Sequence, residues 1–303
     1  MSELPPKLQE LSDAIVAQNP VHAEFLASSM GGLTQEARQG LLEYVEYCTG
    51  RGRSIVYLAD CYNTITNDTL NEQFFFMKHG RYRYSKYAEV ADKVYLDAEY
   101  MNKYMYGLAI TAFLWPNHAK MYEFFVRSFP RGKRGAYLEI GPGHGYYLRT
   151  AAELGNFDRL VGIDVSPTSV ALTRDILEHS SLETSAQIDI VESDFLAVEN
   201  DERGFACIVT GEVLEHVEQP GLFLRKIAEL SDKDTHIFVT TCVNAPSVDH
   251  IFLWRTTDAI EDLIRESGLE IVEPLHVPIT GKTLAECVRD ALPISVAYVL
   301  RKA

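Results

Sequence analysis

The sequence predicts an α/β protein: a mostly parallel β-sheet in the C-terminal half, preceded by an all-α region. From about residue 135, short apolar runs alternate with segments of helical periodicity. Strands that are apolar throughout are typical of a parallel sheet covered on both faces. Up to about Pro130 the apolar residues recur at helical spacing, and strand-like runs are few. We therefore expect two domains, a helical one over residues 1–130 and an α/β one over residues 131–303.

Helices account for the N-terminal region. Thr34 is a suitable N-cap for a helix that Gly50 would end. The apolar residues between them lie roughly one turn apart: Leu41, Leu42, Val45 and Tyr47. Further helices are expected over residues 55–65, 67–78, 98–115 and 117–129. The last of these follows Pro116 and stops at Pro130.

Strands and helices alternate in the C-terminal region. Buried strands are expected over residues 136–140, 160–163, 188–191, 205–210 and 237–241. Helices are expected over residues 147–154, 169–179 and 220–230. The tail then has a helix near 257–267 and two strand-like segments, 269–277 and 294–300. These two segments can pair as an antiparallel edge across a short helical insert at 284–289.

The charge balance argues against nucleic acid as a partner. The chain has 43 acidic and 28 basic residues, which gives a net charge of -15. A polyanion must be neutralised by clusters of Lys and Arg, and the longest basic cluster is the modest run RGKR at residues 131–134.

The N-terminus and the cysteines favour a reduced, aqueous compartment. The chain opens without the basic start and apolar run of a signal peptide, and no apolar stretch approaches the ~20 residues that span a bilayer. The five cysteines are scattered, and no pair has Cys-x-x-Cys spacing. We expect a soluble, cytoplasmic protein with reduced thiols and no membrane partner.

A glycine-rich loop is the sharpest signal in the sequence. The segment LEIGPGHGY at residues 138–146 follows a predicted strand and opens a predicted helix, which is the context of a nucleotide-binding loop. Gly141 permits the tight turn, while Gly143 and Gly145 let a ligand approach the backbone without a Cβ between them. His144, inside the loop, is expected beside the ligand.

Two residues in this segment oppose a dinucleotide. A dinucleotide fold would have its third glycine one place later, where Tyr146 stands. Glu139 places a carboxylate two residues before the first glycine, where it would repel a pyrophosphate but could hold the ammonium of an amino acid. The loop therefore suits a ligand that carries methionine better than one that carries phosphates.

Carboxylates follow the next two strands. Asp164 ends the second strand, where its oxygens can accept hydrogen bonds from both hydroxyls of a ribose, with Val165 beside it. The alternative for Asp164 is a helix N-cap or turn residue. After the third strand, Asp194 can bind an adenine amino group and Phe195 can stack on the base; the alternative there is a simple loop. The order of these residues along successive strands carries the interpretation.

From residue 135 to 303 the sequence resembles the class I S-adenosylmethionine (SAM)-dependent methyltransferases. The most specific parts are EIGPGHG at residues 139–145 and GEVLEHV at 211–217. The resemblance implies a Rossmann-like, seven-stranded sheet whose last strand is antiparallel, with SAM as the cofactor. It also implies a set of residues around the cofactor: Gly141, Gly143, Asp164, Asp194 and, through its backbone, Glu212.

Residues after strands 4 and 5 are candidates for the chemistry. Ligands of open parallel sheets lie at the carboxyl ends of the strands, and a hydroxyl or ammonium acceptor must lose a proton. His216 is the favoured catalytic base, with packing or capping of the next helix as the alternative. His250 is a second catalytic candidate. Asn244 and Asp249 could contact the substrate, or form a helix-capping turn.

The helical region supplies further candidates for substrate binding. Seven tyrosines lie between residues 82 and 106. Such a stripe either packs half-buried or forms an aromatic lid over the acceptor. Tyr104 and Tyr106 are taken as substrate contacts, together with His118. The sequence shows no convincing set of carboxylates for a divalent cation, so a metal-independent reaction is expected.

The function that follows is methyl transfer from SAM to a small metabolite, to a hydroxyl or amine rather than carbon. Many bacterial secondary-metabolite enzymes of the family pair such a domain with a helical cap. Three alternatives stay open: a protein or carrier-bound substrate, a non-catalytic SAM-binding module, and an NAD-dependent oxidoreductase. A homodimer is compatible with the sequence.

Overall fold

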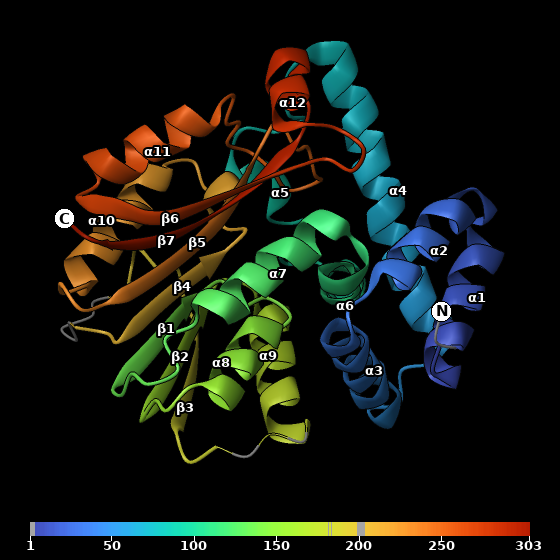
Figure 1. Cartoon of the computed structure of the whole chain (residues 1–303), viewed down its shortest axis with the longest axis horizontal. Coiled ribbons are helices and arrows are strands. Elements are labelled where there is room, and N and C mark those ends of the chain that lie inside the picture. The colour runs from blue at the N-terminus through green and yellow to red at the C-terminus, as the bar shows by residue number, and fades with distance from the viewer. Residues whose placement is uncertain (1–3, 181, 183, 199–203) are drawn as a thin grey trace.

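One mixed sheet organises the C-terminal part of the computed structural model (Figure 1). The structure describes residues 4–180, 182, 184–198 and 204–303. The strands are β1 (Ala136–Ile140), β2 (Arg159–Asp164), β3 (Gln187–Glu192), β4 (Cys207–Gly211), β5 (His236–Val243), β6 (Leu269–Pro278) and β7 (Ile294–Lys302). Their order is β3-β2-β1-β4-β5-β7-β6. β7 runs antiparallel to both of its neighbours, β5 and β6, and the other pairs are parallel, so the predicted sheet is confirmed.

Helices make up the N-terminal part and cover the sheet. Those before the sheet are α1 (Pro6–Gln18), α2 (Ala23–Gly32), α3 (Gln35–Gly50), α4 (Ile55–His79), α5 (Tyr87–Val90), α6 (Ala98–Leu114) and α7 (Pro116–Ser128). Those between strands are α8 (Tyr146–Leu154), α9 (Pro167–His179), α10 (Pro220–Leu230), α11 (Thr257–Glu266) and α12 (Leu284–Asp290). Two 3-10 turns, η1 (Pro20–His22) and η2 (Leu214–His216), complete the set. None of the helices described here is long and apolar enough to cross a membrane.

The structure changes one detail of the predicted elements and adds the order of the last two strands. The helices expected over residues 55–65 and 67–78 are one continuous helix, α4. The threonines near the expected break return their hydroxyls to the helix, since Thr64 Oγ1 donates to the carbonyl of Asp60 and Thr66 Oγ1 to that of Tyr62. The expected pairing of the last two strands is confirmed, but β7 lies between β5 and β6, so β6 forms the edge.

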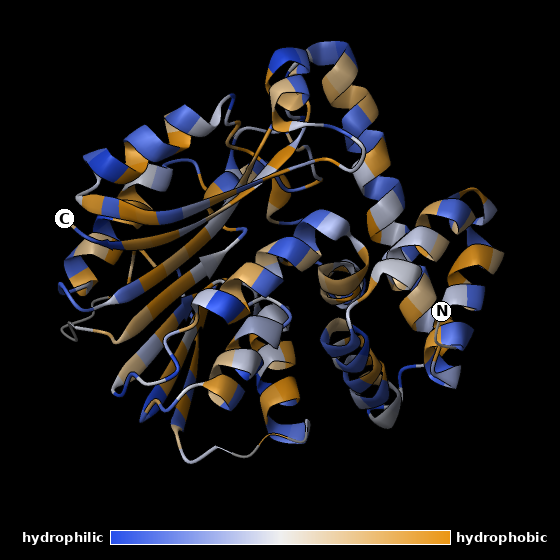
Figure 2. Ribbon diagram, in the orientation of Figure 1, coloured by the Kyte–Doolittle hydropathy of each residue, from blue (hydrophilic) through white to orange (hydrophobic). Residues whose placement is uncertain are grey.

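The sheet buries both faces, as its continuous apolar strands require. Side chains alternate along β5: Phe238 packs with Phe124 and Phe125 of α7, whereas Ile237 and Val239 belong to the core under α10 and α11. In Figure 2 the central strands are mostly orange, while the covering helices alternate blue and orange. This pattern is that of a three-layer α/β sandwich.

The helical region shares its core with one face of the sheet. One contiguous cluster of buried residues runs from Leu8 in α1 through α3, α4 and α6 to Val299 in β7. Polar contacts add to it. Tyr47 of α3 donates to Asp175 of α9 at 2.5 Å, and Arg51 Nη2 lies 2.6 Å from the same carboxylate. These contacts fix the helices over the carboxyl ends of the strands, where the site lies.

Gly145 is required by helix packing, and its replacement should destabilise the fold. The residue has φ of +77°, and a Cβ there would lie 2.8 Å from the Cα of Thr173 in α9. Gly281 has a similar φ of +80° but open space around the Cβ position. We expect Gly145→Ala to lower the free energy of unfolding by about 2 kcal/mol more than Gly281→Ala, because only the first meets backbone. Urea denaturation measures both; equal losses would contradict the packing role.

Candidate active site

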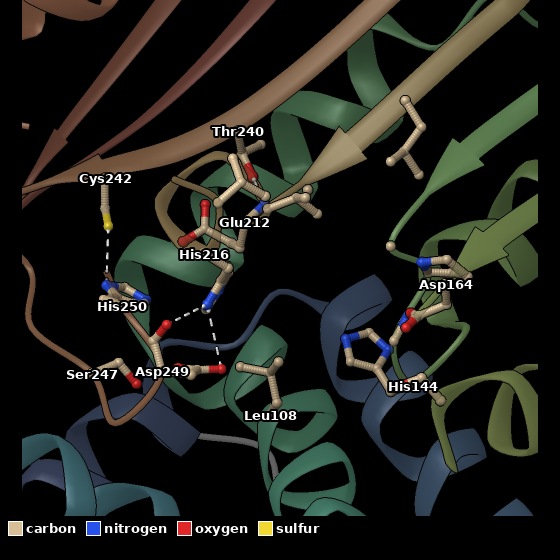
Figure 3. A pocket seen from close by; sticks show the side chains of 18 of the residues that line it. Leu108, His144, Asp164, Glu212, His216, Thr240, Cys242, Ser247, Asp249 and His250 are labelled. Atoms are coloured by element: carbon tan, nitrogen blue, oxygen red, sulfur yellow. Dashed lines mark hydrogen bonds and ion pairs between the residues drawn. The ribbon is translucent and has the colours of Figure 1, made fainter. Parts of the chain in front are cut away.

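A cavity of about 730 Å³ opens at the carboxyl ends of β1, β2, β4 and β5, beneath α4, α6 and α7. Ligands of open α/β sheets bind at this edge. Most of the predicted site residues line the cavity: Glu139, Gly141, Gly143, His144, Asp164, Val165, Asp194, Phe195, Glu212, His216, Asp249, His250, Tyr104 and His118. Figure 3 shows His144 and Asp164 on one side of it and His216, Asp249 and His250 on the other. These two sides are named the cofactor end and the acceptor end below.

The glycine loop forms the floor of the cofactor end. Gly141 and Gly143 have φ of +69° and +57°, the left-handed region that glycine adopts without strain. A Cβ on Gly141 would lie 2.6 Å from Val213 Cγ2, and one on Gly143 would lie 3.2 Å from Met105 Sδ. Gly145 does not line the cavity, since it faces α9. The structure therefore gives Gly145 a packing role rather than the ligand approach expected from the sequence.

Asp164 joins the end of β2 to the glycine loop. Its carboxylate accepts hydrogen bonds from the backbone N–H of Gly143 at 3.1 Å and of Ser166 at 2.8 Å. Each carboxylate oxygen has a second lone pair, and the residue lines the cavity. Burial raises the pKa of Asp164 to about 6, against the lowering effect of these backbone donors. The N-cap of α9 is Ser166 instead, which accepts from Ser169.

Glu139 and His144 are buried beside the loop. Glu139 accepts a hydrogen bond from the Tyr137 hydroxyl at 2.6 Å, and burial raises its pKa to about 8. His144 Nδ1 lies 3.1 Å from the backbone N–H of Tyr146, which donates to it. Burial lowers the pKa of His144 to about 4, so its ring is neutral at pH 7.

The remaining residues of the cofactor end follow β3 and β4. Phe195 is buried and packs on Phe223, while Asp194 is exposed and accepts from the N–H of Leu196. Glu212 has φ of +52°, and its N–H donates to Thr240 Oγ1 at 2.9 Å. Within the described part of the chain, Glu212 Oε1 is buried without a hydrogen-bond partner. Left-handed backbone at a non-glycine residue and an unpaired buried oxygen are typical of functional sites.

A polar network forms the acceptor end. His216 Nδ1 lies 3.0 Å from the Tyr95 hydroxyl, 3.2 Å from the carbonyl oxygen of Asp249 and 3.4 Å from its carboxylate. Both oxygens of the Asp249 carboxylate accept from tyrosines, one from Tyr95 at 3.2 Å and one from Tyr104 at 3.1 Å. The side chain of Asp249 is only 2% exposed. The network thus holds the His216 ring through its Nδ1.

His250 lies next to this network. Its ring is 4.8 Å from that of His216, and its Nδ1 is 2.6 Å from the carbonyl oxygen of Ala245, to which it can only donate. Burial, together with the neighbouring His216, lowers the pKa of His250 to about 3. His250 is therefore neutral and carries its proton on Nδ1.

Two predicted substrate contacts do not reach the cavity. Tyr106 points to the opposite side of α6 from Tyr104, because residues two apart on a helix are separated by about 200°. Its hydroxyl accepts from Arg53 Nε at 3.2 Å. Asn244 is a turn residue with φ of +49°, and its side-chain amide donates to the carbonyl of Arg255. His118 does line the cavity, where it lies 2.9 Å from Thr111 Oγ1.

The structure also brings in residues that the sequence did not single out as contacts. Tyr95 bonds to both His216 and Asp249, although it lies more than 120 residues away from each in the chain. Ser247 lies 3.3 Å from the Tyr104 hydroxyl. The tyrosine-rich stretch was the one signal that could have indicated Tyr95, and nothing in that stretch separates it from the other tyrosines.

Two groups of side chains have donor atoms close enough for a metal ion. They are Glu215 with Cys242 and His250, and His216 with Asp249 and His250; within each group the donors lie within 4.8 Å of one another. These donors are already paired with protein groups. Glu215 accepts from Thr241 Oγ1 at 2.7 Å, and burial raises the pKa of the Cys242 thiol far above its usual range.

Comparison with known proteins supports the fold of the C-terminal region. Residues 117–265 match a family model described as a methyltransferase domain. The comparison with curated proteins gives no match.

Solved structures share the architecture at low identity. The mitomycin 7-O-methyltransferase MmcR is 13% identical over 82% of this chain and 70% of its own, with a TM-score of 0.55. The [4+2]-cyclase SpnF is 16% identical over 61% of this chain and 81% of its own, with a TM-score of 0.50. The N-methyltransferase NodS from Bradyrhizobium japonicum WM9, in complex with S-adenosyl-l-homocysteine, is 19% identical over 62% and 88%, with a TM-score of 0.47. At these identities the likeness shows the fold alone.

The residues of the cofactor end suit SAM. Asp164 has free lone pairs for hydroxyls, Glu139 is a buried carboxyl group without a cationic partner among the described residues, and the loop leaves no Cβ at Gly143. Together with the strand order and the methyltransferase-domain model that matches residues 117–265, this arrangement has the features of a class I SAM-dependent methyltransferase domain, and the cofactor that it suits is SAM.

Proposed function

We propose that the protein transfers the methyl group of SAM to a hydroxyl or amine of a small molecule. One observation carries the proposal: a single cavity joins Asp164 and the glycine loop to His216 and Asp249 (Figure 3). SAM, when bound, supplies an electrophilic methyl group. The task of the protein is to hold the acceptor in line, exclude water and remove a proton.

Each residue of the cofactor end has a proposed role. Asp164 accepts from the ribose hydroxyls, while Asp194 and Phe195 bind the adenine with Val165 against it. Glu139 accepts from the ammonium of the methionine part, which would ionise this carboxyl group. The unpaired Glu212 Oε1 is a further acceptor for the same ligand.

His216 is the base in this proposal, and His250 is its neighbour. With Nδ1 donating to Asp249, the lone pair of His216 lies on Nε2, which can take a proton. His250 is a poor base because its pKa is lowered to about 3. Asp249 and Tyr95 set the tautomer and orientation of the His216 ring. Removal of one proton from oxygen or nitrogen is the task that a single imidazole performs.

In this proposal, the helical region of residues 1–130 covers the acceptor end. Tyr104, Met101 and Met105 of α6 line the cavity together with Trp115, and such side chains exclude water. A site set into such a cavity favours a free small molecule over a protein or carrier-bound substrate. A place in bacterial secondary metabolism is compatible with it.

An acceptor screen tests the proposal. Purified protein with isotope-labelled SAM would be incubated with phenols, catechols and aromatic amines, and labelled product would be measured. Transfer of label with one product per SAM consumed supports the proposal. Saturable SAM binding without transfer to any member would instead favour a role without methyl transfer. This control matters because a [4+2]-cyclase shares the fold.

SAM affinity should depend on pH through Asp164. Its pKa is raised to about 6, so the carboxylate that accepts from the ribose is lost as the pH falls through 6. The pKa values of its neighbours Glu139 and His144, about 8 and 4, lie outside the range from pH 5 to 7. We expect SAM to bind about tenfold more weakly at pH 5 than at pH 7. Calorimetry at both pH values checks this, and Asp164→Asn should remove the dependence.

The raised pKa of Asp164 also determines how the stability of the fold depends on pH. The pKa of Asp164 is raised above its ordinary value of 3.8, so the folded state holds the proton more tightly than the unfolded chain. The contribution of this group to stability is fully present below pH 3.8 and is lost as the pH rises through about 6. As the pH rises from 5 to 7, ionisation of Asp164 should therefore strengthen SAM binding but lower the stability of the protein without ligand.

The reaction is proposed to need no metal. The candidate donor atoms pair with protein groups, as described above. Activity on any acceptor found should therefore survive EDTA treatment, with kcat unchanged within about twofold. Loss of activity on chelation, restored by a divalent cation, would assign a metal to His216, Asp249 and His250.

A further inference from the structure

We propose that the acceptor site discriminates by charge: it binds neutral or cationic aromatic molecules and rejects those that carry a carboxylate or phosphate. This inference rests on the proposed function, whose acceptor class it narrows. It follows from the charges and ring surfaces that line the cavity.

The ionisable side chains of the cavity lining are mostly acidic. Its carboxyl groups are Glu139, Asp164, Asp194, Glu212, Glu218 and Asp249. No Lys or Arg occurs among the described residues that line it. A site for an anionic acceptor would present at least one such side chain, because guanidinium and ammonium groups are the usual partners of carboxylates and phosphates.

The two arginines within the tyrosine-rich stretch, Arg81 and Arg83, bind protein groups outside the cavity. Arg83 Nε lies 2.8 Å from the carboxylate of Glu72, and Arg81 Nη1 donates to the carbonyl of Tyr82 at 3.0 Å. Neither lines the cavity. These residues are adjacent to the tyrosines in sequence, yet they do not offset the charge of the site.

Asp249 is the carboxylate at the acceptor end itself. It is buried, and its partners there are the hydroxyls of Tyr95 and Tyr104 and the ring of His216. These partners bring no fixed positive charge. An anion placed beside Asp249, away from bulk water, would meet a like charge that no described cation of the lining offsets.

The walls of the acceptor end suit a flat ring. Tyr95 stacks with Tyr87 at 5.6 Å between ring centres and 17° between planes, and Tyr104 stacks with Tyr100 at 5.9 Å and 21°. Met101, Met105 and Leu108 of α6 add further apolar lining. Ring faces attract both aromatic molecules and ammonium groups, and Asp249 adds attraction for the second.

Matched ligand triples test the inference by binding. Tyramine, 4-hydroxyphenylacetamide and 4-hydroxyphenylacetate share one ring and differ in charge; tryptamine, indole-3-acetamide and indole-3-acetate form a second triple. Each is titrated into the complex with S-adenosylhomocysteine, which lacks the sulfonium charge of SAM. We expect the acids to bind at least about tenfold more weakly than the amides, and the amines as well as the amides or better. Acids that bind as tightly as amides would overturn the inference.

Charge variants on α4 provide a matched control. Thr69 and Gln73 of α4 line the cavity, whereas Asn71 between them is exposed and does not. Thr69→Lys and Gln73→Lys should reduce the difference in affinity between the acids and the amides. Asn71→Lys makes the same change in net charge and should leave that difference unchanged. An equal effect of all three would show that net charge, not the lining, sets the preference and would contradict the inference.

The readout separates this inference from the proposed function. Ligand affinity is measured without turnover, so a charge preference can appear even when no methyl transfer is found. Methyl transfer to acids and amides with equal kcat/KM would support the proposed function and overturn the inference. Amide binding without transfer, with acids excluded, would support the inference and count against the proposed function.

Discussion

SAM should bind about 30- to 150-fold more weakly to Asp164→Ala than to the wild type, a loss of about 2–3 kcal/mol. The variant loses the carboxylate proposed to accept from both ribose hydroxyls. It also loses the acceptor for the N–H groups of Gly143 and Ser166, which hold the glycine loop against β2. Both losses act on the same ligand, and calorimetric titration with SAM measures them together.

Asp189→Ala is the matched control for this variant. Asp189 lies on the neighbouring strand β3 and pairs with Arg159 Nε at 2.6 Å, outside the cavity. The substitution should leave SAM affinity unchanged within about twofold, because Asp189 does not line the cavity. Equal affinities of wild type and Asp164→Ala would place the cofactor elsewhere in the cavity.

Replacing His216 with alanine should lower kcat about 100-fold while SAM affinity stays within about twofold. The reason is that His216 lies at the acceptor end, across the cavity from Asp164 (Figure 3). The measurement is the steady-state rate on an acceptor from the screen, and added imidazole should restore part of the lost rate.

Two further variants separate the base from its surroundings. Asp249→Asn keeps the imidazole but changes the group that orients it, so kcat should fall less than in His216→Ala. His179→Ala is the control, because His179 is a partly exposed histidine of α9 that does not line the cavity. This substitution should leave kcat unchanged. If His216→Ala keeps the wild-type kcat, His216 is not the catalytic base. Such a result would indicate an acceptor that needs no deprotonation.

The fold could be predicted largely because its signals are local. Apolar strands, the spacing of glycines and the Thr34 cap each depend on neighbouring residues, and Thr34 Oγ1 does accept from the N–H of Ala37. The place of β7 between β5 and β6 depends on pairing between distant segments, which the sequence pattern does not encode. The merging of two expected helices into α4 shows the same limit, since threonine side chains can bond within a helix.

The sequence predicted most of the residues that line the cofactor end of the cavity, but only some of those that line the acceptor end. The glycine loop and Asp164 follow directly after strands, so topology alone brings them together. Tyr95 contacts His216 and Asp249 only because the helical region packs against the sheet. The sequence pattern does not show which residues of the two regions come into contact. Helix geometry alone could have separated Tyr104 from Tyr106, because side chains two residues apart face opposite ways.

Calorimetric titration of the purified protein with SAM, and separately with NAD, tests the central claim most directly. The structure predicts saturable SAM binding in the micromolar range and no response to NAD, because Glu139 lies beside the loop and Tyr146 replaces the third glycine. Binding of NAD with no heat from SAM would contradict the account of the cofactor end and, with it, the proposed methyl transfer.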